Sequence, residues 1–90
     1  MNDYVYILHC GDGSLYTGWT NNLAARVKAH QEKRGAKYTK SHQPVELIYF
    51  EVCANRSAAL KREAQIKRMT RAQKLLLIAG QTERRDDQTS

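Results

Sequence analysis

The chain has 90 residues, which is enough for one small domain with a small core. Fifteen Lys and Arg against nine Asp and Glu give a formal net charge of +6, and a small basic domain usually has a polyanionic partner. No apolar run approaches the roughly 20 residues of a membrane span, the first residues lack signal-peptide order, and Cys10 and Cys53 show no CxxC spacing, so we expect a cytoplasmic protein with reduced thiols and no zinc site.

Residues 4–19 predict a β-hairpin, because two short apolar runs, Tyr4–His9 and Leu15–Trp19, flank the turn sequence Gly11-Asp12-Gly13. Both faces of the first run are largely apolar, which is typical of a central strand that is covered on both sides. The length of the turn then decides which side chains of the two strands share a face.

Two registers are open for this hairpin. A two-residue turn would put Tyr6 and Tyr16 on opposite faces, whereas a three-residue loop would pair Tyr6 with Gly18 and put both tyrosines on one face. Three-residue loops commonly end in a left-handed residue, which Gly13 supplies, so we prefer the second register. A ligand backbone could then approach closely at Gly18, which has no side chain.

A helix is expected from about Asn21 to Gln31, entered through residues of N-cap type. Leu23 and Val27 are four residues apart and should face the core. Arg26 and His30 are also four apart, so they lie on a neighbouring stripe, either as a site or as ordinary helix charges favoured by the helix dipole.

The segment Gln31–Gln43 is polar and basic, and it reads as a loop. Its cations, with one aromatic residue among them, suit phosphate contact combined with base stacking. Tyr38 can equally be a packing anchor, and both interpretations stay open. The candidate nucleic-acid contacts here are Lys33, Arg34, Lys37, Tyr38 and Lys40.

The second half of the chain predicts one strand and two helices. Val45–Val52 is rich in β-branched and aromatic residues, and we expect it to pair with the first strand. Helices follow at Ser57–Met69, with Ser57 as N-cap, and at Arg71–Ala79, with Gly80 as a stop. Residues 1–80 should form a single α+β domain, and residues 81–90 a polar, disordered tail.

Glu63 is the unusual member of the first of these two helices. It shares a helix face with Ala59, Leu60 and Ile66, on the side that should meet the sheet. An ordinary ion pair with Lys67 explains it, but a carboxylate on a semi-buried face more often has a cationic or metal partner, because an unpaired one is costly. A lone carboxylate also suits a single Mg²⁺, which keeps most of its waters.

The order of these motifs resembles the GIY-YIG nuclease domain family, and within it the small stand-alone bacterial members. The resemblance covers roughly residues 2–79. It rests on Tyr4-Val5-Tyr6, Tyr16-Thr17-Gly18, Arg26, His30 and Glu63, together with the G-D-G-S-L-Y-T-G turn, the G-A-K-Y-T loop and the A-L-K-R-E helix. It implies a three-stranded antiparallel sheet flanked by helices in the order β-β-α-β-α-α.

The activity that the resemblance implies is metal-dependent hydrolysis of nucleic-acid phosphodiester bonds, with one Mg²⁺ or Mn²⁺ at Glu63. By position, Tyr6, Tyr16, Arg26 and His30 match the other catalytic residues, and Gly18 matches the motif glycine. Arg26 would clamp phosphate oxygens, Tyr6 would serve as the base, and Tyr16 would orient water or phosphate. DNA is the expected substrate, with irregular or branched DNA as one option and RNA as another.

A second interpretation is a nucleic-acid-binding module with little or no activity. Several cleaving members place a polar residue in the helix after the glutamate, where this chain has Lys74-Leu75-Leu76-Leu77. The chain also has no separate DNA-binding domain. The joint presence of both tyrosines, Arg26 and Glu63 favours the enzyme, because binding alone does not require a semi-buried glutamate.

Overall fold

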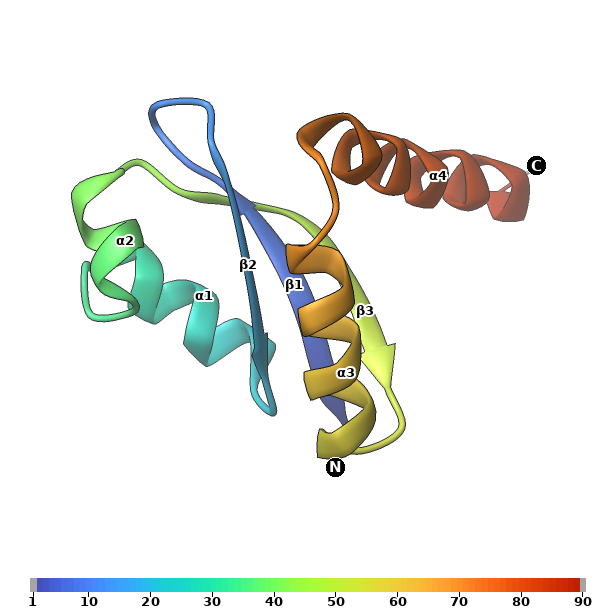
Figure 1. The fold of residues 1–90 in the computed structure, drawn as a ribbon, viewed down its shortest axis with the longest axis horizontal. Coiled ribbons are helices and arrows are strands. Elements are labelled where there is room, and N and C mark those ends of the chain that lie inside the picture. Colours follow the sequence, from blue (N-terminus) through green and yellow to red (C-terminus); the bar gives the residue numbers. More distant parts are fainter. Residues whose placement is uncertain (1, 90) are drawn as a thin grey trace.

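The structure, a computed structural model, describes the backbone of residues 2–89 and the side chains of residues 2–81. A three-stranded antiparallel sheet in the order β2-β1-β3 carries helices on its faces (Figure 1). This arrangement confirms the predicted α+β class and the pairing of the third strand with the first. The elements in chain order are β1 (Asp3–His9), β2 (Leu15–Thr20), α1 (Leu23–Gln31), α2 (Lys37–Ser41), β3 (Glu46–Cys53), α3 (Arg56–Lys67) and α4 (Arg71–Thr89).

The hairpin has the three-residue loop. Tyr6 pairs with Gly18, and Leu8 pairs with Tyr16. Gly13 has a φ of 87°, the left-handed conformation that such a loop requires. The preferred register is therefore confirmed, and with it the placement of both tyrosines on one face of the sheet.

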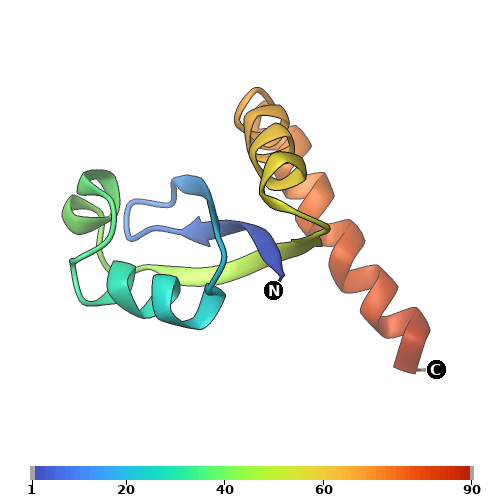
Figure 2. The ribbon, with the colours of Figure 1, turned by 90° about the horizontal axis from the view of Figure 1, so that it is seen from below.

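The sheet separates two apolar clusters. On one face, Val5 and Ile7 pack with Ala59 and Ile66 of α3. On the other face, Tyr6 and Leu8 pack with residues of β3 and with Leu23 and Val27 of α1, as expected for the apolar stripe of that helix. Figure 2 shows α1 and α3 on opposite sides of the strands.

Helix caps explain where the helices begin. Asn22 caps α1, and its side chain accepts a hydrogen bond from the Ala25 amide at 3.2 Å. The N-cap of α3 is Asn55 rather than Ser57, because the Asn55 side chain accepts from the Ala58 amide at 2.9 Å, two residues earlier than predicted. Thr70 and Gln73 form a reciprocal capping box at the start of α4.

Two further differences from the prediction concern α2 and α4. The expected loop Gln31–Gln43 contains α2, which has five residues and is therefore too short to show a helical period. α4 continues through Gly80 to Thr89, so the predicted helix stop at Gly80 is wrong; one glycine costs a helix only about 1 kcal/mol relative to alanine. Ser90 lies outside the described residues, and the division into a domain and a tail stays a prediction.

Several apolar side chains on α3 and α4 are exposed, among them Leu60, which was expected to meet the sheet. Leu60 of α3 is 39% exposed, and Leu75 and Leu76 of α4 are 45% and 73% exposed. On α4, Leu77 and Ile78 instead pack against the core.

Within the described part of the chain, no helix is both long and apolar enough to cross a membrane.

Candidate active site

Tyr6 of β1 reaches across its neighbour in β2 to the edge of the sheet. A Cβ atom built on Gly18 would lie 2.5 Å from the Tyr6 hydroxyl oxygen and 2.7 Å from its Cζ. Only glycine therefore fits beneath this ring. The sequence predicted that a ligand could approach closely at Gly18, but the Tyr6 side chain fills this space. The role of the glycine is therefore to leave room for the Tyr6 ring.

His30, at the end of α1, lies within hydrogen-bond distance of the Tyr6 hydroxyl. Its Nε2 lies 2.8 Å from the Tyr6 oxygen, and its Nδ1 lies 2.6 Å from Oγ1 of Thr39 in α2. Tyr6, His30 and Thr39 are all buried. Burial lowers the pKa of His30, and the charge of Arg26 lowers it further, so the imidazole is neutral at neutral pH.

The segment after α1 is built around the His30 ring. A Cβ on Gly35 would lie 2.3 Å from Nδ1 of His30, so the chain passes directly against the imidazole. The side-chain amide of Gln43 donates to the carbonyls of His30 and Thr39 at 2.8 and 2.7 Å, which ties α1 to α2. The segment for which the sequence predicted nucleic-acid contacts thus also positions the His30 ring, and the sequence analysis did not predict this role.

α1 ends in a way that directs the chain back onto His30. Lys33 has a φ of 64°, and the Arg34 amide donates to the Ala29 carbonyl at 2.7 Å, which is the Schellman pattern of a helix C-terminus. This turn brings Gly35 beside the His30 ring within five residues. The sequence G-A-K-Y-T was the available signal, but nothing in its composition points to histidine.

Arg26 lies on the exposed face of α1, one turn before His30. Burial raises the pKa of Tyr6, whereas the Arg26 guanidinium beside its hydroxyl lowers it; the neighbouring Tyr16 and Glu63 raise it. These influences show that Tyr6, Tyr16, Arg26 and Glu63 share one electrostatic environment. Tyr16 also lies against His30, with ring centroids 5.4 Å apart.

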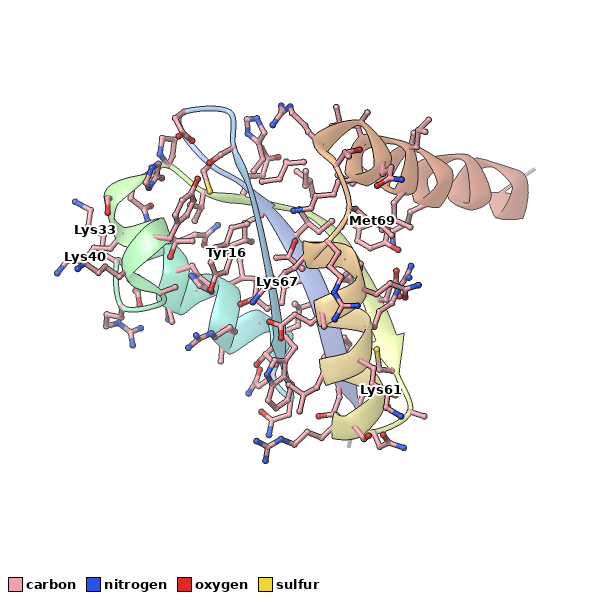
Figure 3. The ribbon with its side chains drawn as sticks, viewed as in Figure 1. Tyr16, Lys33, Lys40, Lys61, Lys67 and Met69 are labelled. Carbon is pink, nitrogen blue, oxygen red and sulfur yellow. The ribbon has the colours of Figure 1, made fainter. Side chains whose placement is uncertain are left out.

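Glu63 approaches this environment from the opposite face of the sheet, because α3 packs on the other side from α1. Its side chain is 16% exposed, and its Oε2 lies 3.4 Å from Nζ of Lys67 one turn later, so the ion pair considered for it is present. Lys67 lies between α3 and β2 in Figure 3. Among the described residues, no three metal-ligating side chains cluster, which leaves Glu63 as a lone carboxylate at the site.

A second ion pair sets the orientation of α3. Arg62 donates from Nε and Nη2 to the two carboxylate oxygens of Glu51 in β3, each at 2.9 Å, and the Tyr49 hydroxyl donates to the same carboxylate. Burial, then the bond to Glu51, raises the pKa of Tyr49 to about 12. A bidentate pair of this kind is directional, so it fixes the rotation of α3 and with it the position of Glu63.

Tyr38 belongs to an aromatic stack beside the site. Its ring stacks on His42 at 4.0 Å and on Tyr16 at 5.9 Å, and its hydroxyl donates to Ser14 at 2.6 Å. Of the two interpretations for Tyr38, packing is therefore seen directly. Tyr38 itself remains 40% exposed, so contact with a base stays a prediction.

The cations after α1 surround the segment that holds His30. Lys33, Arg34, Lys37 and Lys40 are exposed, and Lys33 and Lys40 point away from the body of the protein (Figure 3). Arg34 pairs with Glu32, which offsets part of its charge. This arrangement leaves the three lysines facing solvent, as phosphate contacts would require.

The model of the GIY-YIG catalytic domain matches residues 2–75. The UPF0213 protein CPE1444 of Clostridium perfringens is 56% identical over 80 residues, covering 89% of this chain and 86% of the relative. A UPF0213 protein of Syntrophus aciditrophicus is 55% identical over 83 residues, covering 91% and 95%.

Two solution NMR structures resemble this fold. UPF0213 protein BH0048 from Bacillus halodurans aligns with a TM-score of 0.58 and 39% identity, covering 88% of this chain and 84% of that one. Protein EF2693 from E. faecalis aligns with a TM-score of 0.61 and 39% identity, covering 89% and 85%. The sheet and its flanking helices are thus shared with proteins of known structure.

Proposed function

Because the chain belongs to the GIY-YIG catalytic domain family, and so has a nuclease-type function, we propose that it is a metal-dependent endonuclease that hydrolyses DNA phosphodiester bonds. The observation that carries the proposal is the contact of 2.8 Å between the Tyr6 hydroxyl and the buried imidazole of His30. A neutral histidine beside a tyrosine is a proton acceptor positioned for catalysis.

Tyr6 acts as the base together with His30. Burial raises the pKa of Tyr6, so a phenolate formed in advance is disfavoured. The Tyr6 oxygen instead takes a proton from the attacking water while its own proton passes to Nε2 of His30. This paired transfer avoids a buried unpaired charge on the tyrosine.

Arg26 and Tyr16 position the phosphate. The guanidinium of Arg26 is exposed on α1 beside the Tyr6 hydroxyl, and it can hold two phosphate oxygens while the water attacks. Tyr16 lies against His30, and its hydroxyl is assigned to orienting the water or the phosphate. These contacts supply charge neutralisation and orientation, which phosphodiester hydrolysis requires.

Glu63 fits a single divalent cation, because a lone carboxylate is the ligand set from which Mg²⁺ or Mn²⁺ keeps most of its waters. Such an ion, when bound, neutralises the phosphate and stabilises the leaving oxygen. Nζ of Lys67 lies 3.4 Å from Oε2 of Glu63, and because the Lys67 side chain is 55% exposed, this ion pair is weak enough for a cation to replace the lysine.

The substrate contacts are assigned to the exposed lysines Lys33, Lys37 and Lys40, with Arg34 and Tyr38 as further contacts. Each phosphate that they neutralise adds about 0.9 to the magnitude of the log–log salt slope on duplex DNA. Irregular or branched DNA is the proposed substrate, and RNA is the option that the binding assay separates. We assign the protein to the cytoplasm, without a membrane partner.

A nucleic-acid-binding module without activity is the second candidate. It is favoured by the Glu63–Lys67 ion pair, which accounts for the carboxylate without a metal, and by the stretch Lys74-Leu75-Leu76-Leu77 of α4, where several cleaving members carry a polar residue.

The test incubates pure protein with supercoiled plasmid, single-stranded DNA, branched DNA and RNA, with and without Mg²⁺ or Mn²⁺. Glu63→Gln should abolish cleavage and leave DNA affinity similar or slightly higher, because one repulsive charge near the phosphate is lost. Glu46→Gln removes the same charge from an exposed position at the start of β3 and should cleave like the wild type. Metal-dependent cleavage that persists in Glu63→Gln excludes the metal-ligand role, and binding without any cleavage favours the module.

A further inference from the structure

His30 can accept the Tyr6 proton only if its Nε2 carries a lone pair. The neutral imidazole has one protonated nitrogen, and the hydrogen bond made by the other nitrogen decides which. In this chain Nδ1 faces the segment Ala36–Thr39, whereas Nε2 faces Tyr6. The proton arrangement around Nδ1 therefore controls the chemistry at Tyr6.

Two proton arrangements are possible, and each leaves one contact unmade. In the first, Tyr6 donates to Nε2, Nδ1 donates to Thr39 Oγ1 at 2.6 Å, and the Thr39 hydroxyl donates to the Ala36 carbonyl at 3.0 Å. The Ala36 amide then lacks Nδ1 as its acceptor. In the second, the Thr39 hydroxyl and the Ala36 amide, which is 3.4 Å away, both donate to Nδ1, and Nε2 donates to Tyr6. The Ala36 carbonyl then lacks the Thr39 hydroxyl as its donor.

The surroundings of Tyr6 favour the first arrangement. The Tyr6 hydroxyl has one proton and is buried, and the Arg26 guanidinium beside it can only donate. His30 is therefore the acceptor that this proton needs. The second arrangement also relies on a contact of 3.4 Å, which is longer than the usual range of about 2.7–3.2 Å for an N–H donor.

We propose that Thr39 is a positioning residue that holds His30 as the Nδ1-protonated tautomer, so that the Nε2 lone pair faces the Tyr6 hydroxyl. The three hydrogen bonds then connect Tyr6, through His30 and Thr39, to the carbonyl of Ala36 at the N-cap of α2, and each of the two hydroxyl groups donates its one proton. The catalytic consequence rests on the proposed function, since the proton that Nε2 receives is the one Tyr6 releases during hydrolysis. Thr39 acts through His30 and touches no substrate.

The tautomer can be read without any nuclease activity. The protein is labelled with ¹⁵N at its three histidines, and two-bond ¹H–¹⁵N correlations are recorded above the ordinary histidine pKa of about 6.5. The His30 signals are identified by their loss in His30→Gln. We expect the Nδ1-protonated form in the wild type and in Thr39→Ser, which keeps the hydroxyl. Thr39→Val keeps the shape but removes the acceptor, so its signal should move toward the Nε2-protonated form.

The same variants are assayed for nicking of supercoiled plasmid with Mg²⁺ or Mn²⁺. Thr39→Val should lower the rate about 10- to 100-fold, a part of what a general base contributes, and Thr39→Ser should restore it. Thr17→Val is the matched control, because Thr17 is also a buried threonine of the described chain but has no hydrogen-bond partner there. It should change neither the tautomer nor the rate.

The outcomes separate this proposal from the proposed function. An Nε2-protonated His30 in the wild type, or an unchanged tautomer in Thr39→Val, overturns the role of Thr39 whether or not the protein cleaves DNA. Nicking by Thr39→Val at the wild-type rate overturns it as well. A wild type with the expected tautomer and no cleavage of any substrate refutes the nuclease while the tautomer assignment stands. If Thr39→Val does not fold, the wild-type spectrum and Thr39→Ser still decide.

Discussion

Gly18→Ala should damage the site through Tyr6. The added Cβ would lie 2.5 Å from the Tyr6 oxygen, and a separation of about 3.5 Å is the closest that such atoms comfortably adopt, so the hydroxyl must retreat by about 1 Å. Tyr6 is only 1% exposed, and its ring cannot move without disturbing its neighbours. The 2.8 Å bond to His30 is then lost or badly lengthened.

Two losses follow from this displacement. Overpacking a buried site typically costs about 1–3 kcal/mol, and each kcal/mol lowers the thermal midpoint of a domain of this size by about 4–8 °C. A misplacement of about 1 Å in a catalytic group can lower the rate about 100-fold. Thermal unfolding followed by circular dichroism, and plasmid nicking below the midpoint of the variant, measure the two effects separately.

Gly80→Ala is the matched control, because a Cβ there meets nothing within 4 Å and the residue lies inside α4. It should raise the free energy of unfolding by about 0.5–1 kcal/mol and leave nicking unchanged. If Gly18→Ala keeps both the wild-type midpoint and the wild-type nicking rate, the Tyr6 ring does not occupy the space above Gly18 and the reasoning fails.

Three further predictions concern stability, measured as the free energy of unfolding in urea. Thr17→Val should raise it by about 1–3 kcal/mol, because the buried hydroxyl has no partner among the described residues; a decrease would reveal one. Arg62→Met should lower it by about 1–3 kcal/mol by breaking the bidentate pair with Glu51, whereas its exposed neighbour Lys61→Met should have little effect. Burial lowers the pKa of His30, so the neutral imidazole stabilises the fold above the ordinary pKa of about 6.5, and this stabilisation is lost as the pH falls below it. The free energy of unfolding should then fall by up to about 1.4 kcal/mol per pH unit. His30→Gln should make this fall less steep, and an equal pH dependence in both proteins would contradict a buried neutral His30.

The hairpin was predictable because its information is local. Gly13 can adopt the left-handed conformation, and the alternation of side chains along a strand then determines that Tyr6 and Tyr16 share a face. The pairing of β3 with β1 was also predictable from the apolar faces of the first strand. Both inferences use spacings of a few residues, where backbone geometry leaves few choices.

The environment of His30 could not be predicted in the same way. Gly35 and Thr39 contact its ring only because α1 ends at a left-handed Lys33 and the chain turns back. The face of α3 was partly misjudged because Arg62, a charged residue, reaches inward to Glu51 while Leu60 is left exposed. In each case a tertiary hydrogen bond or ion pair overrides the residue's usual preference.

The residues that position His30 and the exposed lysines of α2 belong to the same short stretch of chain. Gly35 and Thr39 hold the imidazole, while Lys37 and Lys40 of α2 face solvent a few side chains away. A five-residue helix opens locally more readily than the sheet does, and any polyanion that binds its lysines only in the closed form lowers the population of the open one by mass action. Occupancy by nucleic acid and order at His30 are then thermodynamically linked, so that the molecule is most completely assembled for proton transfer when a phosphate backbone is already in place.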